Sequence, residues 1–470
     1  MSLKKSYATL FLIGWFFFPF NDYKGFPLLG EFKNETGAFF FMAGFIILLI
    51  DVVSKGKISI PYKSKIFQIL LLFFIWCLLT IVFNFPQVTQ SYFKHTSGVE
   101  RFIRQYFSLL LSAFVFVILY WNVIKDFKTV EILNKIRKVF LACLIFAFIY
   151  GLLETAIVVF GFNFIRPILS LFDYFPFLDV NYPPGGRISS IAYESPSLGN
   201  YLITISGWMF SYVLTSKSRY RFIPLLMVLF LTFFSGSRTA LINVSIQLLI
   251  FSFVLFSFQE YRQTILNLVK YSFLITIVFL VINGEKIIKE FDKKLESLDF
   301  SGNLTTSISN QTRFGMQYAS LQVFKEHPII GVGFGQETYY KRFHYPAWAK
   351  KNNWEFELLY ENNKVKSFPT AYNMYTRLLA ETGIIGVSIF LMLIYLSILR
   401  SKYIWKNGKD EQKIMGLILL ISFVGMSLNW LQTDFFRQHG FWLCLVILIK
   451  ILNDLSSLNL LDQTKPSKIT

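Results

Sequence analysis

The chain has 470 residues, of which 54% are hydrophobic and 16% are charged. Soluble domains carry about 25% charged residues, and apolar stretches long enough to cross a bilayer recur along the whole chain. This composition excludes an ordinary soluble protein and predicts an all-α, polytopic membrane protein. The net charge of +18 does not indicate nucleic-acid binding, because the Lys and Arg residues form short clusters between apolar runs.

The first 20 residues, MSLKKSYATLFLIGWFFFPF, combine a basic start with an apolar core. No small-residue cleavage site follows, so we expect a retained first span and not a removed signal peptide. The cysteines, Cys77, Cys143 and Cys444, all lie inside apolar runs. This placement argues against a disulfide framework and against a zinc site.

Twelve membrane-spanning helices are predicted. They lie near residues 7–20, 36–53, 66–84, 103–123, 138–160, 197–215, 222–236, 239–258, 265–283, 384–400, 413–430 and 439–453. The loops between them alternate between rich and poor in Lys and Arg, and cytoplasmic loops carry the excess of positive charge. Both termini are therefore predicted to be cytoplasmic.

One segment, residues 284–383, lacks a span and is predicted to be a large external loop. Loops of this length are uncommon unless they are functional or separately folded. Within it, FGMQYASLQVF (314–324) has helical spacing and is expected to lie along the membrane. The predicted organisation has four parts: spans one to nine over 1–283, the loop over 284–383, the last three spans over 384–456, and a cytoplasmic tail over 457–470.

Polar motifs gather on the predicted outer side. The first is GGRISSIAYESPSLGNYL, which contains Arg187 and Glu194, and the second is SGSR, which ends at Arg238. The third is QTRFGMQYASLQVFKEHPIIGVGFGQ, which contains Arg313 and is followed by TAYNMYTRLLAETGIIG. An arginine at the end of a span often anchors lipid headgroups, which is the alternative interpretation of Arg187 and Arg238.

Taken together, these arginines predict an anion site, because few carboxylates lie near them in the sequence. The planar guanidinium group matches the oxygens of phosphate. An anion that approaches in the membrane plane suggests a lipid phosphate or diphosphate.

In order and spelling, these motifs resemble the bacterial O-antigen polymerase and ligase superfamily of membrane glycosyltransferases. The similar stretches lie between residues 187 and 387, and the span count with one large outer loop extends the resemblance to most of the chain. The resemblance implies transfer of a glycan from undecaprenyl diphosphate at the outer face of the bacterial inner membrane. The implied partners are this donor, a glycan or lipid A-core acceptor, and membrane lipids.

The resemblance also assigns roles to residues. Arg238 and Arg313 match the diphosphate-binding arginines of the family, and Arg187 is expected to assist them. No metal and no cofactor are expected. In the ligase branch a histidine precedes Asn373, but this sequence has Tyr372 there. A tyrosine with a pKa near 10 is a poor general base.

Several other polar residues are candidates for the reaction. Glu194 and Glu381 are the alternatives to Tyr372 as catalytic groups, although Glu381 is also spaced to pair with Arg377 on a helix. The further candidates are His327, His344, Asn373, Asp434 and Arg437. Asp434 and Arg437 either close the site or pair with each other. Glu154 lies deep in the fifth span and requires a partner that the sequence does not identify.

The aromatic stretch YYKRFHYPAWAKKNNWEFELLY (339–360) suits either a glycan groove or a membrane-interface belt. Of the two enzymatic functions, repeat-unit polymerisation is favoured over ligation to lipid A-core because Tyr372 replaces the histidine. A lipid-sugar transporter is less favoured, since it predicts midplane polar residues and internal repeats. A non-catalytic membrane scaffold is disfavoured by the set of arginines.

Overall fold

A computed structural model describes residues 2–182, 186–256, 262–263, 266, 270 and 307–463. This part of the chain is mostly helical, with one two-residue antiparallel hairpin of β1 (Tyr92–Phe93) and β2 (Thr96–Ser97). Among the described residues, seven helices are long and apolar enough to cross a membrane. The chain is therefore an integral membrane protein built from helices, as predicted.

The helices follow the predicted apolar runs closely. The long ones are α1 (Leu3–Phe16), α2 (Thr36–Lys55), α3 (Lys65–Phe83), α5 (Gly98–Leu110), α6 (Phe116–Ile124), α7 (Thr129–Val158), α9 (Ser195–Thr215), α10 (Ile223–Ser235), α11 (Arg238–Phe256), α13 (Ile308–Glu326), α16 (Met374–Asn407), α17 (Asp410–Asn429) and α18 (His439–Gln463). The short ones are α4 (Phe85–Gln90), α8 (Arg166–Leu169), α14 (Glu337–Lys341) and α15 (Ala347–Lys350). The span predicted at 265–283 lies outside the described residues.

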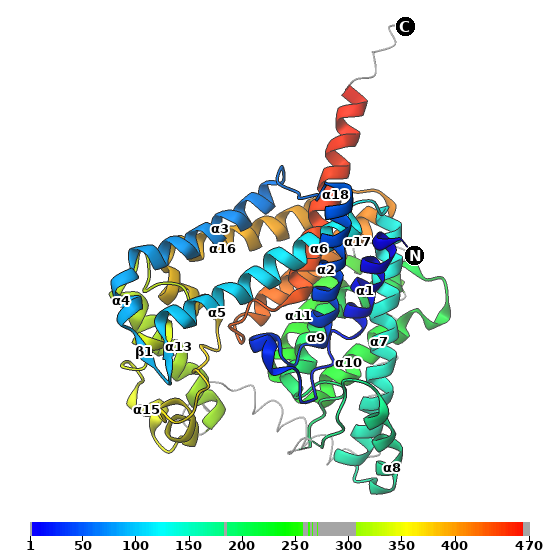
Figure 1. The fold of residues 1–470 in the computed structure, drawn as a ribbon. Coiled ribbons are helices and arrows are strands. Elements are labelled where there is room, and N and C mark those ends of the chain that lie inside the picture. Colours follow the sequence, from blue (N-terminus) through cyan, green and yellow to red (C-terminus); the bar gives the residue numbers. More distant parts are fainter. Residues whose placement is uncertain are drawn as a thin grey trace.

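Two helices form the centre of the molecule. α9 packs against α7, α10, α11 and α17, and α18 packs against α6 and α17 (Figure 1). Both carry long runs of buried side chains, including the fully buried Trp208 and Trp442. A helix that is apolar all round belongs in such a position, because it has no face to present to water. Glu194, directly before α9, and Arg437, just before α18, both line the candidate site.

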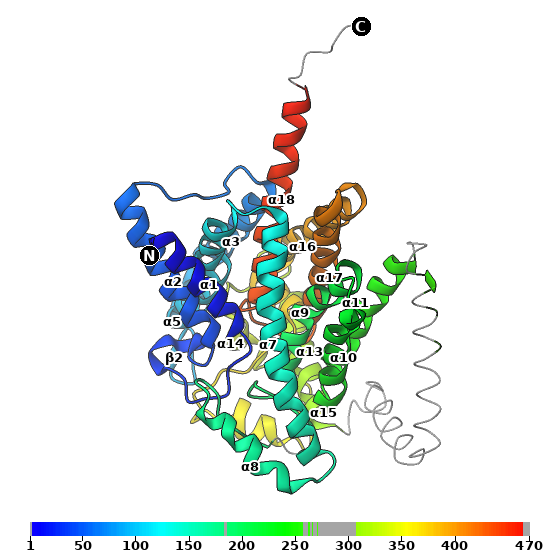
Figure 2. The ribbon, with the colours of Figure 1, turned by 90° about the vertical axis from the view of Figure 1, so that its right-hand side faces the viewer.

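The described part of the predicted large loop lies against the ends of several helices. α13 confirms the helix predicted at 314–324 and packs against α14, α15 and α16. In Figure 1, α3 and α16 run side by side toward α4, α13 and α15, and the C-terminal end of α18 lies on the opposite side of the molecule. Figure 2 shows α7 running the length of the molecule to α8.

A break at Gly383 divides α16. Gly383 has φ +63° and ψ −170°, and a Cβ atom there would lie 2.1 Å from the carbonyl oxygen of Ile329. Only glycine fits this combination of left-handed φ and close backbone approach. The segment after the break is the span predicted at 384–400, and the segment before it forms the wall of a site. The GVGFG stretch (331–335) docks here, with the Val332 amide donating to the Ala380 carbonyl at 2.9 Å.

The partner of the buried Glu154 is the chain segment that follows Arg187. The Glu154 carboxylate accepts hydrogen bonds from the backbone amides of Ser189, at 3.0 Å, and Ser190, at 2.7 Å. Ser190 has a left-handed φ of +52° and donates its hydroxyl to the Ala147 carbonyl. These bonds fasten the RISS sequence to α7, which fixes where Arg187 lies.

Candidate functional site

Three neighbouring cavities open among the described residues. The first, of about 270 Å³, is lined by Arg187, Arg238 and Arg313 and is called the arginine cavity. The second, of about 460 Å³, is called the central cavity and contains Glu194. The third, of about 290 Å³, lies along α5 and is called the α5 cavity. Volumes of a few hundred Å³ are typical of small-ligand sites.

The cavities adjoin one another in series. Four residues line both the arginine cavity and the central cavity, and another four line both the central cavity and the α5 cavity. The first four are Pro196, Arg313, Gln432 and Thr433. The second four are Thr370, Asp434, Phe435 and Arg437. The central cavity is therefore the place where ligands in the two outer cavities would meet.

Positive charge accumulates in the arginine cavity. Its three arginines come from the loop before α9, the start of α11 and the first turns of α13, and no Asp or Glu is among the described residues that line it. Arg238 lies close enough to be repelled by both Arg187 and Arg313. Three guanidinium groups around one space favour a bound anion, because the anion relieves their mutual repulsion and can accept hydrogen bonds from them.

Backbone geometry brings Arg187 to Arg238. Gly236 ends α10 with φ +63°, and a Cβ atom there would lie 2.8 Å from Cγ of Arg187. The Ile188 amide donates to the Phe234 carbonyl at 3.2 Å, which ties the two motifs together. The SGSR sequence therefore needs its glycine for two reasons: the left-handed turn and the passage of the Arg187 side chain.

Arg313 connects the arginine cavity to the central cavity. Its Nη1 donates to Oε1 of Gln432 at 3.1 Å, and its guanidinium lies over the ring of Tyr372 at 5.4 Å. A neutral amide and an aromatic face thus orient the guanidinium.

Glu194 faces the central cavity from the N-cap position of α9. The cavity walls restrict its hydration and raise the pKa of this carboxyl above its ordinary value, while the charge of Arg313 offsets part of the rise. A carboxylate with a raised pKa that faces a cavity beside an arginine has the properties of a general base.

Tyr372 lines the central cavity, and Asn373, the next residue in the chain, caps the helix that follows. Tyr372 has a left-handed φ of +56°, and its hydroxyl oxygen lies 2.6 Å from that of Tyr360. Asn373 caps α16 by accepting hydrogen bonds from the amides of Tyr375, at 2.9 Å, and Thr376, at 3.1 Å. The Tyr372 ring therefore supports Arg313, and Asn373 shapes the start of α16 beside it.

A buried charge cluster completes the central cavity. Arg437 bonds to Glu31 and, at 2.5 Å, to Oε1 of Glu35, whose Oε2 lies 2.9 Å from Nε2 of His439. Burial alone would raise the pKa of each carboxyl, but Arg437 outweighs it and lowers both pKa values, with His439 assisting at Glu35.

Sequence reasoning missed Glu31, Glu35 and His439. The available signal was GEFKNETG, a pair of carboxylates in the predicted outer loop between the first two spans. The sequence left two alternatives for Asp434 and Arg437: to close the site or to pair with each other. Both line the central and α5 cavities, and the pairing is wrong, because Arg437 pairs with the two glutamates. The Asp434 carboxylate instead accepts from the Ala371 amide at 2.5 Å.

Three other sequence candidates lie away from these cavities. Glu381 is buried and pairs with Arg377, with Oε1 and Nε 3.1 Å apart, in the i, i+4 arrangement noted from the sequence. His327 ends α13 and its ring lies 5.7 Å from that of Tyr340. His344 lies 3.3 Å from Glu326. Within the described part of the chain, none of the three lines the arginine, central or α5 cavities.

Residues 222–391 match the family described as O-antigen ligase. This range includes Arg238, Arg313 and Tyr372 and ends within α16. No curated protein matches the chain. Among the described residues, no group of three or more His, Cys, Asp or Glu side chains is placed to hold a metal ion.

Proposed function

On the premise that this chain carries an O-antigen ligase domain over residues 222–391 and belongs to the O-antigen polymerase and ligase superfamily, we propose that it polymerises lipid-linked oligosaccharide repeat units. The donor is a glycan on undecaprenyl diphosphate, and the acceptor is a second glycan. The observation that carries the proposal is the arginine cavity, where three arginines surround one space that opens into the cavity of Glu194.

The chemistry uses the two adjoining cavities. The donor diphosphate binds Arg187, Arg238 and Arg313, which stabilise the negative charge that grows on it as the bond from the anomeric carbon to the phosphate oxygen breaks. The acceptor hydroxyl forms the new bond to that carbon, and Glu194 takes its proton. The diphosphate leaves with the electron pair and remains held by the arginines. No metal ion takes part in these steps.

The proposed setting is the bacterial inner membrane, with twelve spans, both termini in the cytoplasm and the site facing the periplasm. Supporting this topology, Glu35, Arg238 and His439 all lie at the N-terminal ends of their helices. Those are the ends that the Lys/Arg distribution places outside. The C-terminal half of α18 extends toward the opposite side of the molecule (Figure 1).

Ligation of finished polymer to lipid A-core is the second candidate, favoured by the description of the matched family. Tyr372 argues against the histidine mechanism of that branch, because its hydroxyl is engaged with Tyr360. A lipid-sugar transporter remains the weaker alternative, since the polar residues gather in cavities at the helix ends and not along a path through the molecule.

The test is glycan display in cells that lack this protein and are complemented with wild type, Glu194→Gln or the matched control Glu357→Gln. Glu357 is exposed and lies outside the three cavities, among the residues that the structure describes. Surface and lipid-linked glycans are separated on gels. We expect Glu194→Gln to reduce transfer by about 100-fold or more and Glu357→Gln to be active.

The glycan pattern of the deletion strain separates the functions. A single repeat unit on the acceptor, with the ladder lost, identifies a polymerase. Long polymer that accumulates on the carrier identifies a ligase. Full transfer by Glu194→Gln would remove Glu194 as the base, and a normal ladder in the deletion strain would refute both enzymatic functions.

A further inference from the structure

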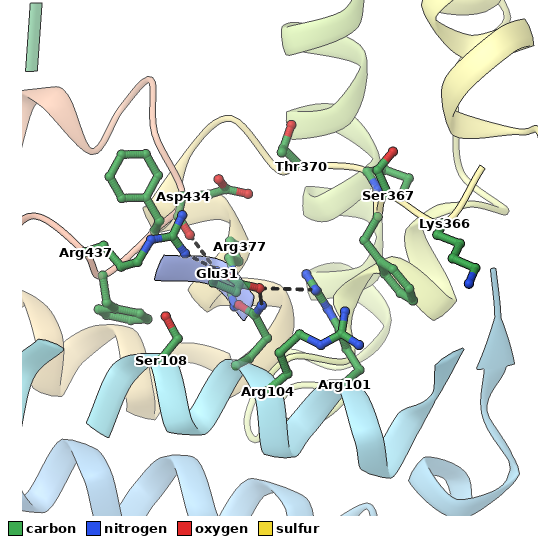
Figure 3. Close-up of a pocket in the computed structure, with 15 residues that line it drawn as sticks. Glu31, Arg101, Arg104, Ser108, Lys366, Ser367, Thr370, Arg377, Asp434 and Arg437 are labelled. Carbon is green, nitrogen blue, oxygen red and sulfur yellow. Dashed lines mark hydrogen bonds and ion pairs between the residues drawn. The ribbon is translucent and has the colours of Figure 1, made fainter. Parts of the chain in front are cut away.

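The α5 cavity is not used by the donor site and is itself lined by charged groups (Figure 3). Its floor is one face of α5, where polar side chains recur at i, i+3, i+4 and i+7. These are Arg101, Arg104, Gln105 and Ser108. The opposite wall is the chain from Lys366 to Thr370, and the end is closed by the segment from Asp434 to Arg437.

Arg101 is held in place while its hydrogen-bonding edge is left available. Its guanidinium lies over the ring of Phe368 at 4.5 Å, and its nearest carboxylate oxygen, on Glu31, is 3.7 Å away. Glu31 is also bonded by Arg437, so it compensates Arg101 only in part. Nε of Arg101 is buried and has no hydrogen-bond partner among the described residues. A stacked guanidinium presents its N–H groups sideways, into the cavity.

The opening of the α5 cavity carries further positive charge, and carboxylates inside the cavity offset part of it. Arg104 and Lys366 are exposed at the opening. Arg104 forms an ion pair with Glu100, with Nη2 and Oε1 2.7 Å apart. Glu31 and Asp434 are among the lining residues.

Two further arginines of the lining are paired with carboxylates, Arg377 with Glu381 and Arg437 with Glu31 and Glu35. Much of the positive charge of the α5 cavity is therefore compensated within the protein, and the cavity suits an anion of low charge.

The position of the α5 cavity identifies which substrate it meets. Among the described residues, none lines both the α5 cavity and the arginine cavity, and each adjoins the central cavity through its own set of residues. With the donor diphosphate in the arginine cavity, the α5 cavity lies on the far side of the reacting centre. It therefore faces the acceptor.

We propose that the α5 cavity binds an anionic group, a carboxylate or a phosphate, on the acceptor glycan. Arg101 and Lys366 are its principal ligands, and the protein selects acceptors that contain an acidic sugar. This assignment rests on the proposed function, since it takes the arginine cavity as the donor site. Carboxylate and phosphate are both oxyanions, and the guanidinium of Arg101 can bind either of them in the plane of its N–H groups.

The experiment measures binding of small probes to the purified full-length protein in detergent by saturation-transfer NMR. The probes are methyl glucuronide, methyl glucoside 6-phosphate, neutral methyl glucoside and inorganic diphosphate. The proteins are wild type, Arg101→Gln/Lys366→Gln and the matched control Lys364→Gln. Lys364 is exposed two residues before Lys366 and lies outside the three cavities, among the residues that the structure describes.

We expect one or both acidic glycosides to bind wild type and Lys364→Gln, and to bind the double variant at least about 5-fold more weakly. The glycoside that responds identifies the anion as carboxylate or phosphate. The neutral glycoside should not distinguish the proteins. Equal binding of the acidic probes to wild type and double variant would overturn the proposal, as would equal binding of neutral and acidic glycosides. If the double variant is unfolded by its melting curve, Lys366→Gln alone is compared with Lys364→Gln under the same criteria.

Failure here is distinguishable from failure of the proposed function. The binding measurement needs no turnover, so an anion site in the α5 cavity is detectable even if glycan display refutes glycan transfer. Diphosphate should bind the double variant as it binds wild type and should be lost in Arg238→Gln/Arg313→Gln. Diphosphate binding that instead depends on Arg101 and Lys366 would show a carrier diphosphate in the α5 cavity and would overturn the assignment to an acidic sugar.

Discussion

The arginine cavity and the Arg437 cluster use the same residue type in opposite ways. In the arginine cavity, three arginines line one space, and no Asp or Glu belongs to the described part of its lining. Arg437, which lines the adjoining central cavity, bonds to the carboxylates of Glu31 and Glu35. Arginines that surround a shared space favour a bound anion, whereas an arginine matched by carboxylates joins parts of the protein. Arg437 links the segment before α18 to the segment before α2.

The difference predicts opposite phenotypes for the two kinds of arginine. Loss of a cavity arginine should weaken ligand binding, because it removes one of the three cations that line the shared space. Loss of Arg437 should remove stability, because it leaves two enclosed carboxylates without their cation.

Arg238→Gln should reduce glycan transfer by about 100-fold and weaken binding of undecaprenyl diphosphate, in a protein whose melting curve shows that it is still folded at the assay temperature. The glutamine keeps much of the side-chain volume but removes the charge that stabilises the leaving diphosphate. Binding is followed by thermophoresis, and melting by the fluorescence of the nine tryptophans. The matched control is Arg166→Gln, an exposed arginine over Tyr182 that lies outside the three cavities, among the described residues. Equal loss in both variants would mean that general charge, and not the cavity, matters.

Arg437→Gln should lower the stability of the folded protein by roughly 3 kcal/mol at neutral pH. Glu31 and Glu35 have lowered pKa values in the folded protein, so their contribution to stability is present above their ordinary pKa and is lost as the pH falls. The difference in melting temperature between wild type and variant should therefore narrow as the pH decreases from 7 toward 4. The triple variant Glu31→Gln/Glu35→Gln/Arg437→Gln should recover part of the loss. A constant difference across this range would contradict the role given to the charge cluster.

Gly236→Ala should weaken donor binding a few-fold and destabilise the protein by about 1 kcal/mol, because alanine resists a left-handed φ. The new Cβ would also displace Arg187. Gly56→Ala is the matched control, since Gly56 ends α2 with φ +69° but a Cβ there meets nothing within 4 Å. Both variants should lose similar stability, and only Gly236→Ala should lose donor affinity. Equal donor affinity in the two variants would separate Arg187 from the binding site.

The sequence by itself determined the helical membrane class, the helices on the described apolar runs and the helix at 314–324. It also singled out the three arginines that the structure brings to one cavity. These depend on local information: apolar run length, the spacing of a helix and the cost of an arginine near a span. The motif order also led to the superfamily that the match over residues 222–391 supports.

Only the tertiary structure decided which charges meet. Arg437 reaches Glu31 and Glu35 across 406 and 402 residues of sequence, and neither spacing nor composition encodes such a contact. The same holds for Glu154, whose partners are backbone amides of a loop outside its span. A side chain's partner depends on how helices pack around α9 and α18, and each packing contact joins segments far apart in the chain. Local patterns therefore found the cations, and the packing decided which of them gather around one cavity and which pair with Glu31 and Glu35.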